Sequence, residues 1–477
     1  MRSYECCIFG AGAAGLGAAL ELVKHGVSNI LIVDRNNIVG GLARTECFDG
    51  VRFDVGPHRF YTKNNEINAL WHKTLGKDFQ RVSRLSRIYY NNHYFNYPLK
   101  LTDVFGNFGL WGSFNIGMSF LAEQCKIKKE AKTFEDWVVQ KFGRKLYEIF
   151  FKVYAEKVWG IPCREIGAEW AAQRIRGLNV TEVLKKALFP HGGQKIKTLV
   201  DEFDYPVLGA GQMYEAMTQK VVAAGAQVML GTAVIAFRHR DNKITSVIIQ
   251  DKEGQRQEVA AGHYFNSIPL THFFKMLDPV LEAPVSNAVQ ELYYREHITV
   301  NLLVDKENVF PDQWLYIHSP EVRTARIANY NNFSAQMVGR SNKTALSMEY
   351  FTFQQEDLWQ LSDDDLRRLA SEELVALGLV ERAMVEKAWV VRETETYPVY
   401  FQDYRRPYQL LKERIDRFEN VSPIGRGGLY KYNNQDHSTL SGLVAVRNYL
   451  KLSDKIYSVW DINEEDEYLE DHERVSR

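Results

Sequence analysis

The sequence predicts an α/β fold built on a Rossmann-like domain, with an interleaved helical insertion and a mixed β domain. Three observations predict it. Residues 4–34 follow a strand–helix–strand pattern, residues 104–200 show helical patterns with few β-branched alternations, and residues 290–350 consist mainly of strand-like runs. The sequence contains no internal repeats or low-complexity linkers. We therefore expect these parts to interleave in space.

A glycine-rich loop joins the first predicted strand to the first predicted helix, and it reads G-x-G-x-x-G. In such a loop Gly10 allows the tight turn, Gly12 lets the backbone approach a pyrophosphate, and Gly15 lets the helix pack on the strand. The helix N-terminus, with Ala13 and Ala14, then faces the phosphates. The loop therefore predicts a dinucleotide-binding site.

An acidic residue stands where this kind of site needs one. Asp34 ends the second predicted strand, residues 29–34, about 20 residues after the loop, where a carboxylate can bind the ribose hydroxyls of an adenosine. Arg35 follows as a further cofactor-binding candidate. A glycine-rich turn without function would not explain Asp34.

The next loop favours FAD over NAD as the dinucleotide. Residues 40–45 read GGLART, and the second glycine, Gly41, lets the chain pass close to a cofactor, with Leu42 beside it. Arg44 can face the phosphates or the ring of the cofactor. The alternative is an ordinary loop with Arg44 in a surface ion pair.

A further turn follows in residues 53–62, FDVGPHRFYT. Gly56 and Pro57 force a turn and hold it rigid. A lone histidine such as His58 is commonly structural. Because this stretch follows a complete fingerprint, we expect the loop to pass over the flavin ring. His58 would then act through a backbone contact or a hydrogen bond to reduced flavin, not as an acid or base.

The later elements follow from periodicity and capping. Thr133 is a predicted N-cap with Asp136 three residues on, which opens a helical stretch at residues 133–159. An Asn-Asn pair between aromatic runs predicts a hairpin at residues 89–100. The remaining predicted elements are strands at 227–239 and 243–251 in a β region that ends near 264–269, a helix at 363–378, and a turn leading into a helix at 425–450.

Composition excludes several classes of function. The chain of 477 residues is 45% hydrophobic and 25% charged with a formal net charge of -1, so a nucleic-acid-binding surface is not expected. The sequence shows neither a signal peptide nor a run of about 18 apolar residues, so we expect no transmembrane segment. The odd number of scattered cysteines indicates a reducing, cytoplasmic compartment. The cysteines lack metal-ligand spacing, and we expect neither a metal site nor disulfides. They are Cys6, Cys7, Cys47, Cys125 and Cys163.

The GGLART loop and FDVGPHRFYT together resemble the UDP-galactopyranose mutases, flavoproteins of the amine oxidase and protoporphyrinogen oxidase superfamily. Further segments carry the resemblance: YAEKVWG at 154–160, TYPVY at 396–400 and GRGGLYKYNNQD at 425–436. It spans nearly the whole chain. The implied division is an FAD-binding domain (GR2-type) from 1–100, 206–275 and 401–477 with an acidic tail, a helical substrate-binding insertion at 101–205, and a mainly β substrate domain at 276–400.

The resemblance implies the site residues. Three arginines, Arg174, Arg326 and Arg426, would bind a substrate pyrophosphate, and the phenols of Tyr397 and Tyr432 would add donors. Taken singly, an arginine is more often a surface or ion-pair residue. The catalytic candidates are these five residues and His58. The other substrate-binding candidates are Tyr154 and Trp159, which would stack on a base or else belong to the core. The C-terminal cofactor-binding candidates are Gly425, Arg426, Asn434 and Gln435, joined at the N-terminal side by Pro57.

The implied reaction is a pyranose–furanose isomerisation of a nucleotide sugar through attack of reduced flavin N5 on the anomeric carbon, without net redox change. FAD is the cofactor, with NAD(P)H as a candidate reductant, and a homo-oligomer is compatible with the family. The alternatives are an FAD-dependent oxidoreductase and a flavoprotein without catalysis. Asn434 departs from the family, which commonly has aspartate there, and Asp436 and His437 follow it. That change of charge would suit a different nucleotide sugar.

Overall fold

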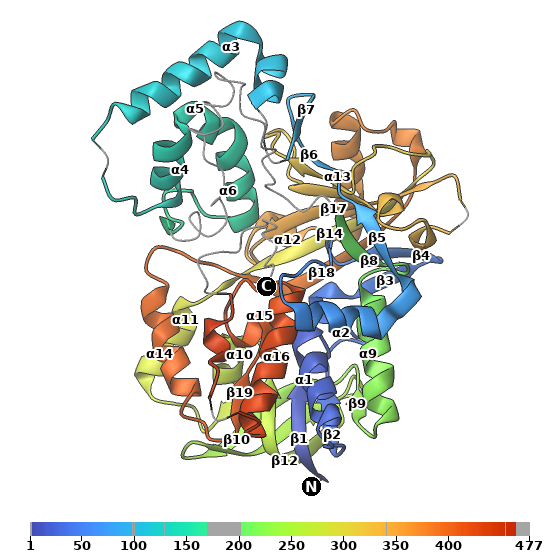
Figure 1. Ribbon diagram of the computed structural model, residues 1–477, viewed down its shortest axis with the longest axis vertical. Coiled ribbons are helices and arrows are strands. Elements are labelled where there is room, and N and C mark those ends of the chain that lie inside the picture. Colours follow the sequence, from blue (N-terminus) through green and yellow to red (C-terminus); the bar gives the residue numbers. More distant parts are fainter. Residues whose placement is uncertain are drawn as a thin grey trace, which may run out of the picture.

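Two large β-sheets and a group of helices make up the computed structural model of the chain (Figure 1). The first sheet lies with the N-terminus at one end, the helical group forms the opposite end, and the second sheet lies between them in this view. The structure describes residues 2–97, 99, 101–127, 129–168, 202–339, 341–453 and 455–463.

The first sheet has eight strands in the order β13-β10-β11-β12-β1-β2-β9, and β19 pairs with β12. In the centre of the sheet, β12, β1, β2 and β9 are parallel neighbours. The strands β10 and β11 pair in antiparallel fashion. The strands are β1 (Arg2–Phe9), β2 (Ile30–Val33), β9 (Gln227–Met229), β10 (Ala233–Arg240), β11 (Lys243–Gln250), β12 (Arg256–Asn266), β13 (Leu277–Asp278) and β19 (Val421–Pro423).

The helices α1 (Ala13–Lys24), α9 (Gly211–Ala223) and α16 (Gln435–Tyr449) pack side by side against this sheet (Figure 1). Cys6 and Cys7 of β1 are fully buried, as expected for core residues. The strand–helix–strand unit of the N-terminus is thereby confirmed. It also brings the C-terminal helix beside the first helix of the chain.

The second sheet has seven strands in the order β18-β14-β17-β16-β15-β6-β7. Most neighbours are antiparallel, but β6 and β15 run parallel. The predicted hairpin is confirmed as the β6–β7 pair. Both of its strands belong to this sheet and not to the first one. The bounds are β6 (Ser86–Tyr90), β7 (His93–Asn96), β14 (Tyr294–Val304), β15 (Trp314–Ile317), β16 (Arg326–Asn329), β17 (Thr344–Thr352) and β18 (Val385–Pro398).

The helical group lies within residues 101–159 of the predicted insertion, whereas the described end of that insertion belongs to the strand β8 (Glu202–Pro206). Thr133 accepts a hydrogen bond from the backbone of Asp136, whose side chain accepts one in return, so the predicted N-cap is confirmed. A kink at Gly109 divides the first helix. The group consists of α3 (Leu101–Gln124), α4 (Phe134–Phe142), α5 (Arg144–Tyr147), the π-helical turn η3 (Glu148–Lys152) and α6 (Val153–Trp159).

Shorter elements complete the fold. Two small antiparallel ladders are formed by β3 (Thr45–Phe48) with β4 (Val51–Asp54), and by β5 (Phe79–Ser83) with β8 (Glu202–Pro206). The remaining α-helices are α2 (Asn65–Leu75), α10 (Leu270–Lys275), α11 (Ala283–Glu291), α12 (Asp357–Gln360), α13 (Asp363–Ala376), α14 (Arg405–Ile415) and α15 (Gly425–Gly428). The 3-10 turns are η1 (Gly41–Ala43), η2 (Gly76–Asp78), η4 (Tyr330–Asn332), η5 (Ala335–Met337), η6 (Arg382–Met384) and η7 (Val459–Asp461).

The predicted α/β class is confirmed, and the strand predicted at 243–251 and the helix predicted at 363–378 are observed within two residues of their expected ends. The stretch predicted as one strand at 227–239 forms two strands, β9 and β10. None of the helices in the described ranges is long and apolar enough to cross a membrane. The domain boundaries stay a prediction. The placement of β6 and β7 in the second sheet shows that the chain crosses between sheets before residue 100.

Candidate functional site

One cavity of about 790 Å³ is lined by residues of both sheets and of the helical group. Its size falls within the range of small-molecule and cofactor sites, roughly 300–1,000 Å³. The glycine-rich loop of β1–α1 lines one part of it, and aromatic side chains of η3 and α6 line another. Residues far apart in the sequence therefore share a single chamber.

Two glycines of the glycine-rich loop, Gly10 and Gly15, leave no room for a side chain. Gly10 has a φ of +103°, a conformation that L side chains rarely adopt. A β-carbon on Gly15 would lie 1.9 Å from the carbonyl oxygen of Gly10. Gly15 does not line the cavity, so its part is to let α1 pack closely on β1. Gly12, Ala13 and Ala14 line the cavity at the first turn of α1.

The GGLART loop closes against the first loop. The backbone N–H of Gly40 donates to the carbonyl of Ala11 over 2.9 Å. A β-carbon on Gly41 would lie 3.3 Å from Cα of Gly12, so the two loops approach backbone to backbone. Gly41 and Leu42 both line the cavity, and the two loops together form one bare-backbone wall.

Asp34 ties this wall together from the end of β2. Its carboxylate accepts from the backbone N–H of Ala11 over 2.7 Å and from that of Asn36 over 2.8 Å. Burial raises the pKa of Asp34, and the two backbone donors act against that rise. Asp34 and Arg35 both line the cavity. Arg35 also contacts β18, where its Nη2 donates to Oγ1 of Thr394 over 3.1 Å.

The structure corrects the expectation for Arg44. This residue does not line the cavity. Its guanidinium is buried in ion pairs, with Glu46 over 2.7 Å and with Glu393 of β18, and it donates to the carbonyl of Gly41 over 3.1 Å. The physical reason is that the buried carboxylate of Glu393 needs a counterion. Arg44 is the counterion of the buried Glu393 carboxylate, and it fixes the GGLART loop to the second sheet.

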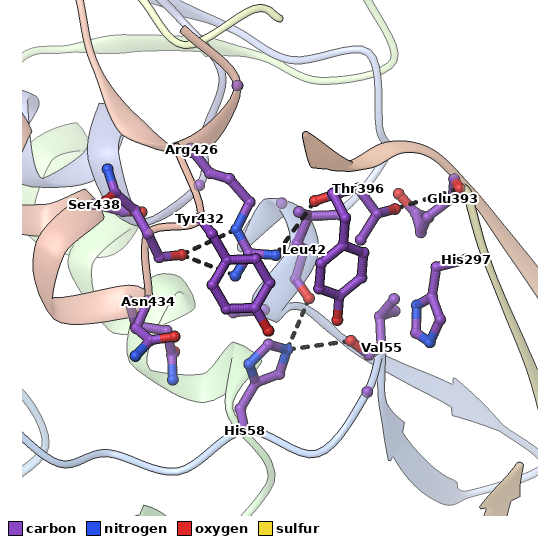
Figure 2. Close-up of a pocket in the computed structure, with 18 of the residues that line it drawn as sticks. Leu42, Val55, His58, His297, Glu393, Thr396, Arg426, Tyr432, Asn434 and Ser438 are labelled. Atoms are coloured by element: carbon purple, nitrogen blue, oxygen red, sulfur yellow. Dashed lines mark hydrogen bonds between the residues drawn. The ribbon is translucent and has the colours of Figure 1, made fainter. Parts of the chain in front are cut away.

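His58 holds two loops at the centre of the cavity. Its Nε2 lies 2.9 Å from the carbonyl oxygen of Leu42 and 3.1 Å from that of Val55, as Figure 2 shows. Both partners are acceptors, so Nε2 carries the proton. Burial and then the nearby arginines lower the pKa of His58 to about 4. The imidazole is therefore neutral, and Pro57 lines the cavity beside it.

Arg426 is a cation fixed without a carboxylate. It donates to the carbonyl of Asn433 through Nε over 2.9 Å and Nη2 over 2.8 Å, and to the carbonyl of Thr396 over 3.3 Å. Its guanidinium carbon lies 4.7 Å from the ring centre of Tyr432 and 5.2 Å from that of Tyr397. Within the described ranges no acidic oxygen comes within ion-pair distance of it.

The two tyrosines lie parallel. Their ring centres are 5.3 Å apart with an interplanar angle of 27°, and both line the cavity. Burial raises the pKa of Tyr397, so its phenol stays a hydrogen-bond donor across the ordinary pH range. The tyrosines and Arg426 therefore form one face of the chamber.

Arg326 lines the same chamber but is neutralised by a buried acid. Its guanidinium makes a two-pronged ion pair with Glu349 of β17, with Nε to Oε1 at 2.6 Å. Burial alone would raise the pKa of Glu349, but Arg326 and then a hydrogen bond from His297 outweigh it and lower it to about 2. The Nε2 atom of His297 lies 3.0 Å from Oε2 of Glu349.

Sequence reasoning missed Glu349 and His297. A usable signal was present in β14: its eleven residues are buried throughout, yet His297, Thr299 and Asn301 put polar side chains at alternate positions. Polar groups on one face of a doubly buried strand indicate a polar site or network there.

The aromatic end of the chamber is formed by the helical group. The ring of Tyr154 stacks on His318, with ring centres 5.0 Å apart and an interplanar angle of 13°. Trp159 is only 2% exposed and packs against Tyr397, Tyr400 and Tyr432. Both candidates line the cavity. Trp159 also belongs to the apolar cluster of the helical group, as expected for a core residue, and its stacking on a base stays a prediction.

The N-terminus of α16 reaches the cavity beside the glycine-rich loop. Asn434 is its N-cap and His437 completes the capping box, so His437 is a cap. Gln435 accepts from the phenol of Tyr214 over 2.5 Å. A β-carbon on Gly425 would lie 2.9 Å from Cβ of Ala14. Gly425, Asn434 and Gln435 line the cavity. Arg174 lies outside the described residues.

These features fit a dinucleotide cofactor. A bare-backbone wall at a helix N-terminus, with a buried acid at the end of the next strand, suits a pyrophosphate and an adenosine ribose. The fold and the cavity thus define a Rossmann-type dinucleotide-binding protein. The chain belongs to the family of flavin-containing amine oxidoreductases, whose model matches residues 13–430. Membership of this family implies FAD.

Individual relatives are more distant. The chain is 28% identical over 174 residues to the "Probable UDP-galactopyranose mutase" of Klebsiella pneumoniae, a match that covers 35% of the chain and 44% of the relative, less than half its length. It superposes on a crystal structure of reduced UDP-galactopyranose mutase with a TM-score of 0.81 at 18% identity, covering 98% of the chain and 99% of that structure. Wild-type putrescine oxidase bound to putrescine gives a TM-score of 0.62 at 14% identity, covering 94% and 99%.

Proposed function

We propose that the chain is an FAD-dependent nucleotide-sugar mutase that interconverts the pyranose and furanose forms of a nucleotide-linked hexose. One observation carries the proposal. Arg426, a cation held only by backbone carbonyls in the described structure, lies with two stacked tyrosines in the cavity that the glycine-rich loop also lines. A diphosphate needs such a cation, because a fixed guanidinium makes paired, charge-assisted hydrogen bonds to it.

The diphosphate would lie between Arg426, Tyr397 and Tyr432. During the reaction the sugar leaves the diphosphate and returns to it, so the negative charge on the diphosphate must be stabilised while the two are apart. The guanidinium carbon of Arg426 lies within 5.2 Å of both tyrosine ring centres, so its charge lies beside the two rings. Arg326 would add a second cation, although Glu349 offsets much of its charge. Arg174 stays a predicted third cation.

The nucleobase would lie at the aromatic end of the chamber. Tyr154 and Trp159 belong to α6 and line this end. Tyr154 is the better stacking partner, because the ring of Trp159 is almost fully enclosed by other tyrosines. Stacking of the base at this end would hold the attached diphosphate in a fixed position relative to the glycine-rich loop.

FAD would bind along the wall formed by the glycine-rich loop, the GGLART loop and the N-terminus of α16. Reduced FAD supplies a nucleophilic nitrogen for the anomeric carbon, with no net redox change. The cofactor-binding residues would be Gly10, Gly12, Ala13, Ala14, Asp34, Arg35, Gly41, Leu42, Pro57, His58, Gly425, Arg426, Asn434 and Gln435. Among them His58 positions the backbone of Leu42 and Val55 and transfers no proton in this proposal.

The aromatic lining of the chamber also favours a second candidate, an FAD-dependent oxidoreductase for a less polar substrate. The two functions differ in what happens to oxidised flavin. Nucleotide hexoses would be added without a reductant, and the flavin absorbance recorded. A mutase leaves the absorbance unchanged, whereas stoichiometric bleaching would favour the oxidoreductase. In parallel, UDP should bind to the wild type and at least about ten times more weakly to Arg426→Ala, given about 1.5–3 kcal/mol per charged hydrogen bond. Equal affinities would count against the diphosphate site.

A further inference from the structure

The chamber contains an imidazole whose surroundings match those of a proton-transfer group. His297 of β14 is 2% exposed and lines the cavity. Its Nε2 faces the carboxylate of Glu349 over 3.0 Å. Because that carboxylate is ionised, it accepts the hydrogen bond, and Nε2 carries the proton. Nδ1 is then the nitrogen that can exchange a proton with a ligand.

The ring of His297 is fixed on several sides. Phe351 stacks on it with ring centres 5.1 Å apart at 21°, and Tyr397 meets it edge to face with ring centres 6.5 Å apart at 86°. Nδ1 has no hydrogen-bond partner among the described residues, and it is not sealed off from the cavity. The structure therefore holds one nitrogen by a buried anion and leaves the other available to a ligand.

The position of this imidazole links it to the loop expected to face the flavin. A β-carbon on Gly56 would lie 3.5 Å from Cε1 of His297 and 3.4 Å from Oε2 of Glu349. The turn at Gly56 therefore lies within van der Waals reach of the imidazole edge and of the carboxylate. In the view of Figure 2, Val55 lies between His297 and His58. The two imidazoles differ in their anchors. His58 is held by two carbonyl oxygens, and His297 by an anion.

We propose that His297, oriented by Glu349, is the group that transfers protons to and from the sugar oxygens. The inference rests on the proposed mutase function. Ring opening breaks the bond between the anomeric carbon and the ring oxygen, and the electron pair stays on that oxygen, which takes a proton from Nδ1 of the imidazolium. The flavin nitrogen that would be bonded to the anomeric carbon would supply the electron pair that this carbon loses. Ring closure forms a bond from a different hydroxyl oxygen to the same carbon, and the proton of that hydroxyl returns to Nδ1. No proton is gained or lost over the cycle.

Glu349 is the positioning residue of this pair. Its ionised carboxylate stabilises the imidazolium, as acids paired with histidine do in other enzymes. Arg326 holds Glu349 in turn through the two-pronged ion pair. This arrangement explains why a cation at the substrate wall is neutralised by a fully buried acid. The acid serves the imidazole as well as the arginine.

The test uses pre-reduced holoenzyme and a nucleotide hexose that the wild type converts. In His297→Ala, kcat should fall by about 10²–10⁴-fold, the usual contribution of a general acid–base group, with KM close to the wild-type value. Added imidazole should restore part of kcat. Tyr397→Phe is the control, because imidazole cannot replace its phenol. In His297→Ala, the FAD content, measured by absorbance, and the UDP affinity, measured by calorimetry, should match those of the wild type.

Two further variants keep the test decisive. His297→Gln keeps a hydrogen-bond donor to Glu349 and is used in case His297→Ala folds poorly. Its kcat should fall as much as that expected for His297→Ala. Glu349→Gln should lower kcat without rescue by imidazole, because His297 is still present. Wild-type kcat in both His297 variants, or loss without imidazole rescue while FAD and UDP still bind, would overturn this inference alone. A wild type that converts no nucleotide hexose would overturn the proposed function as well.

Discussion

Arg426 and Asn433 are joined by two hydrogen bonds to a single atom. Both Nε and Nη2 of the guanidinium donate to the carbonyl oxygen of Asn433, over 2.9 and 2.8 Å. A carbonyl fixes the direction of the guanidinium without cancelling its charge. That relationship separates Arg426 from Arg44 and Arg326, whose charges are offset by buried acids.

Removing this charge should stop turnover, while the other residues of the cofactor wall keep FAD bound. In Arg426→Ala, kcat/KM should fall by at least about 10²-fold, since two or more charge-assisted hydrogen bonds of about 1.5–3 kcal/mol each are lost. Arg426→Lys should recover only part, because an ammonium cannot make paired contacts. Turnover and FAD absorbance are measured on the same samples. Full activity in Arg426→Ala would refute the assignment.

The contact between Gly15 and Gly10 predicts a packing effect on cofactor binding. A β-carbon 1.9 Å from a backbone oxygen must push α1 away from β1, at about 1–3 kcal/mol or more. Gly15→Ala should therefore yield protein with little or no FAD and a lower Tm. Gly117→Ala is the matched control. Nothing lies within 4 Å of a β-carbon there, so FAD content should stay normal. A yellow, stable Gly15→Ala would contradict the packing argument.

The ion pair of Arg44 with Glu393 makes a prediction about stability. Both side chains are almost fully buried, so Arg44→Met should lower the free energy of unfolding by about 3–5 kcal/mol, because it strands a buried carboxylate. Adding Glu393→Gln should restore most of the loss. Urea unfolding of the wild type and the two variants measures this. A single variant as stable as the wild type would show that the pair does not hold the GGLART loop.

The pKa of His58 predicts how stability depends on pH. Burial and the nearby arginines lower it to about 4, so between about pH 6.5 and 4 the unfolded chain binds a proton that the folded chain does not. The free energy of unfolding is therefore lost as pH falls through that window. His58→Gln should lose less than the wild type between about pH 7 and 4.5, with a difference of up to about 2 kcal/mol.

Urea unfolding at both pH values measures the difference. The exposed His93 supplies the control His93→Gln, which should follow the wild type. Asp54, whose burial raises its pKa to about 7, acts in the opposite sense but is common to all three proteins and cancels. Parallel curves for His58→Gln and the wild type would show that His58 is protonated in the folded state.

Local motifs made the cofactor wall predictable. Gly10, Gly12 and Gly15 are needed by short-range geometry, and Asp34 follows at the length of one helix and one strand. The same holds for Thr133 and Asp136, which form their capping box within one turn. Such features depend on neighbours in the sequence, and a single chain displays them directly.

Contacts between residues on different strands could not be predicted from local sequence patterns. His297 and Glu349 are 52 residues apart and meet because β14 and β17 pair in antiparallel register. Arg44 and Glu393 are 349 residues apart in the sequence. The residues around Arg44 therefore did not indicate that its charge is offset by a buried carboxylate. The entry of β6 into the second sheet follows from its parallel pairing with β15. These contacts depend on which strands become neighbours, and local patterns do not encode that.

The most direct test of the central claim is product formation by the wild-type protein. The holoprotein would be reduced with dithionite and incubated anaerobically with UDP-, GDP- and dTDP-hexoses, and the anomeric signals followed by NMR. The mutase account predicts a furanose product from at least one nucleotide hexose, none from the oxidised protein, and no oxidised sugar. Absence of furanose from every one of them with FAD bound and reduced, or an oxidised sugar accompanied by flavin reduction, would contradict it.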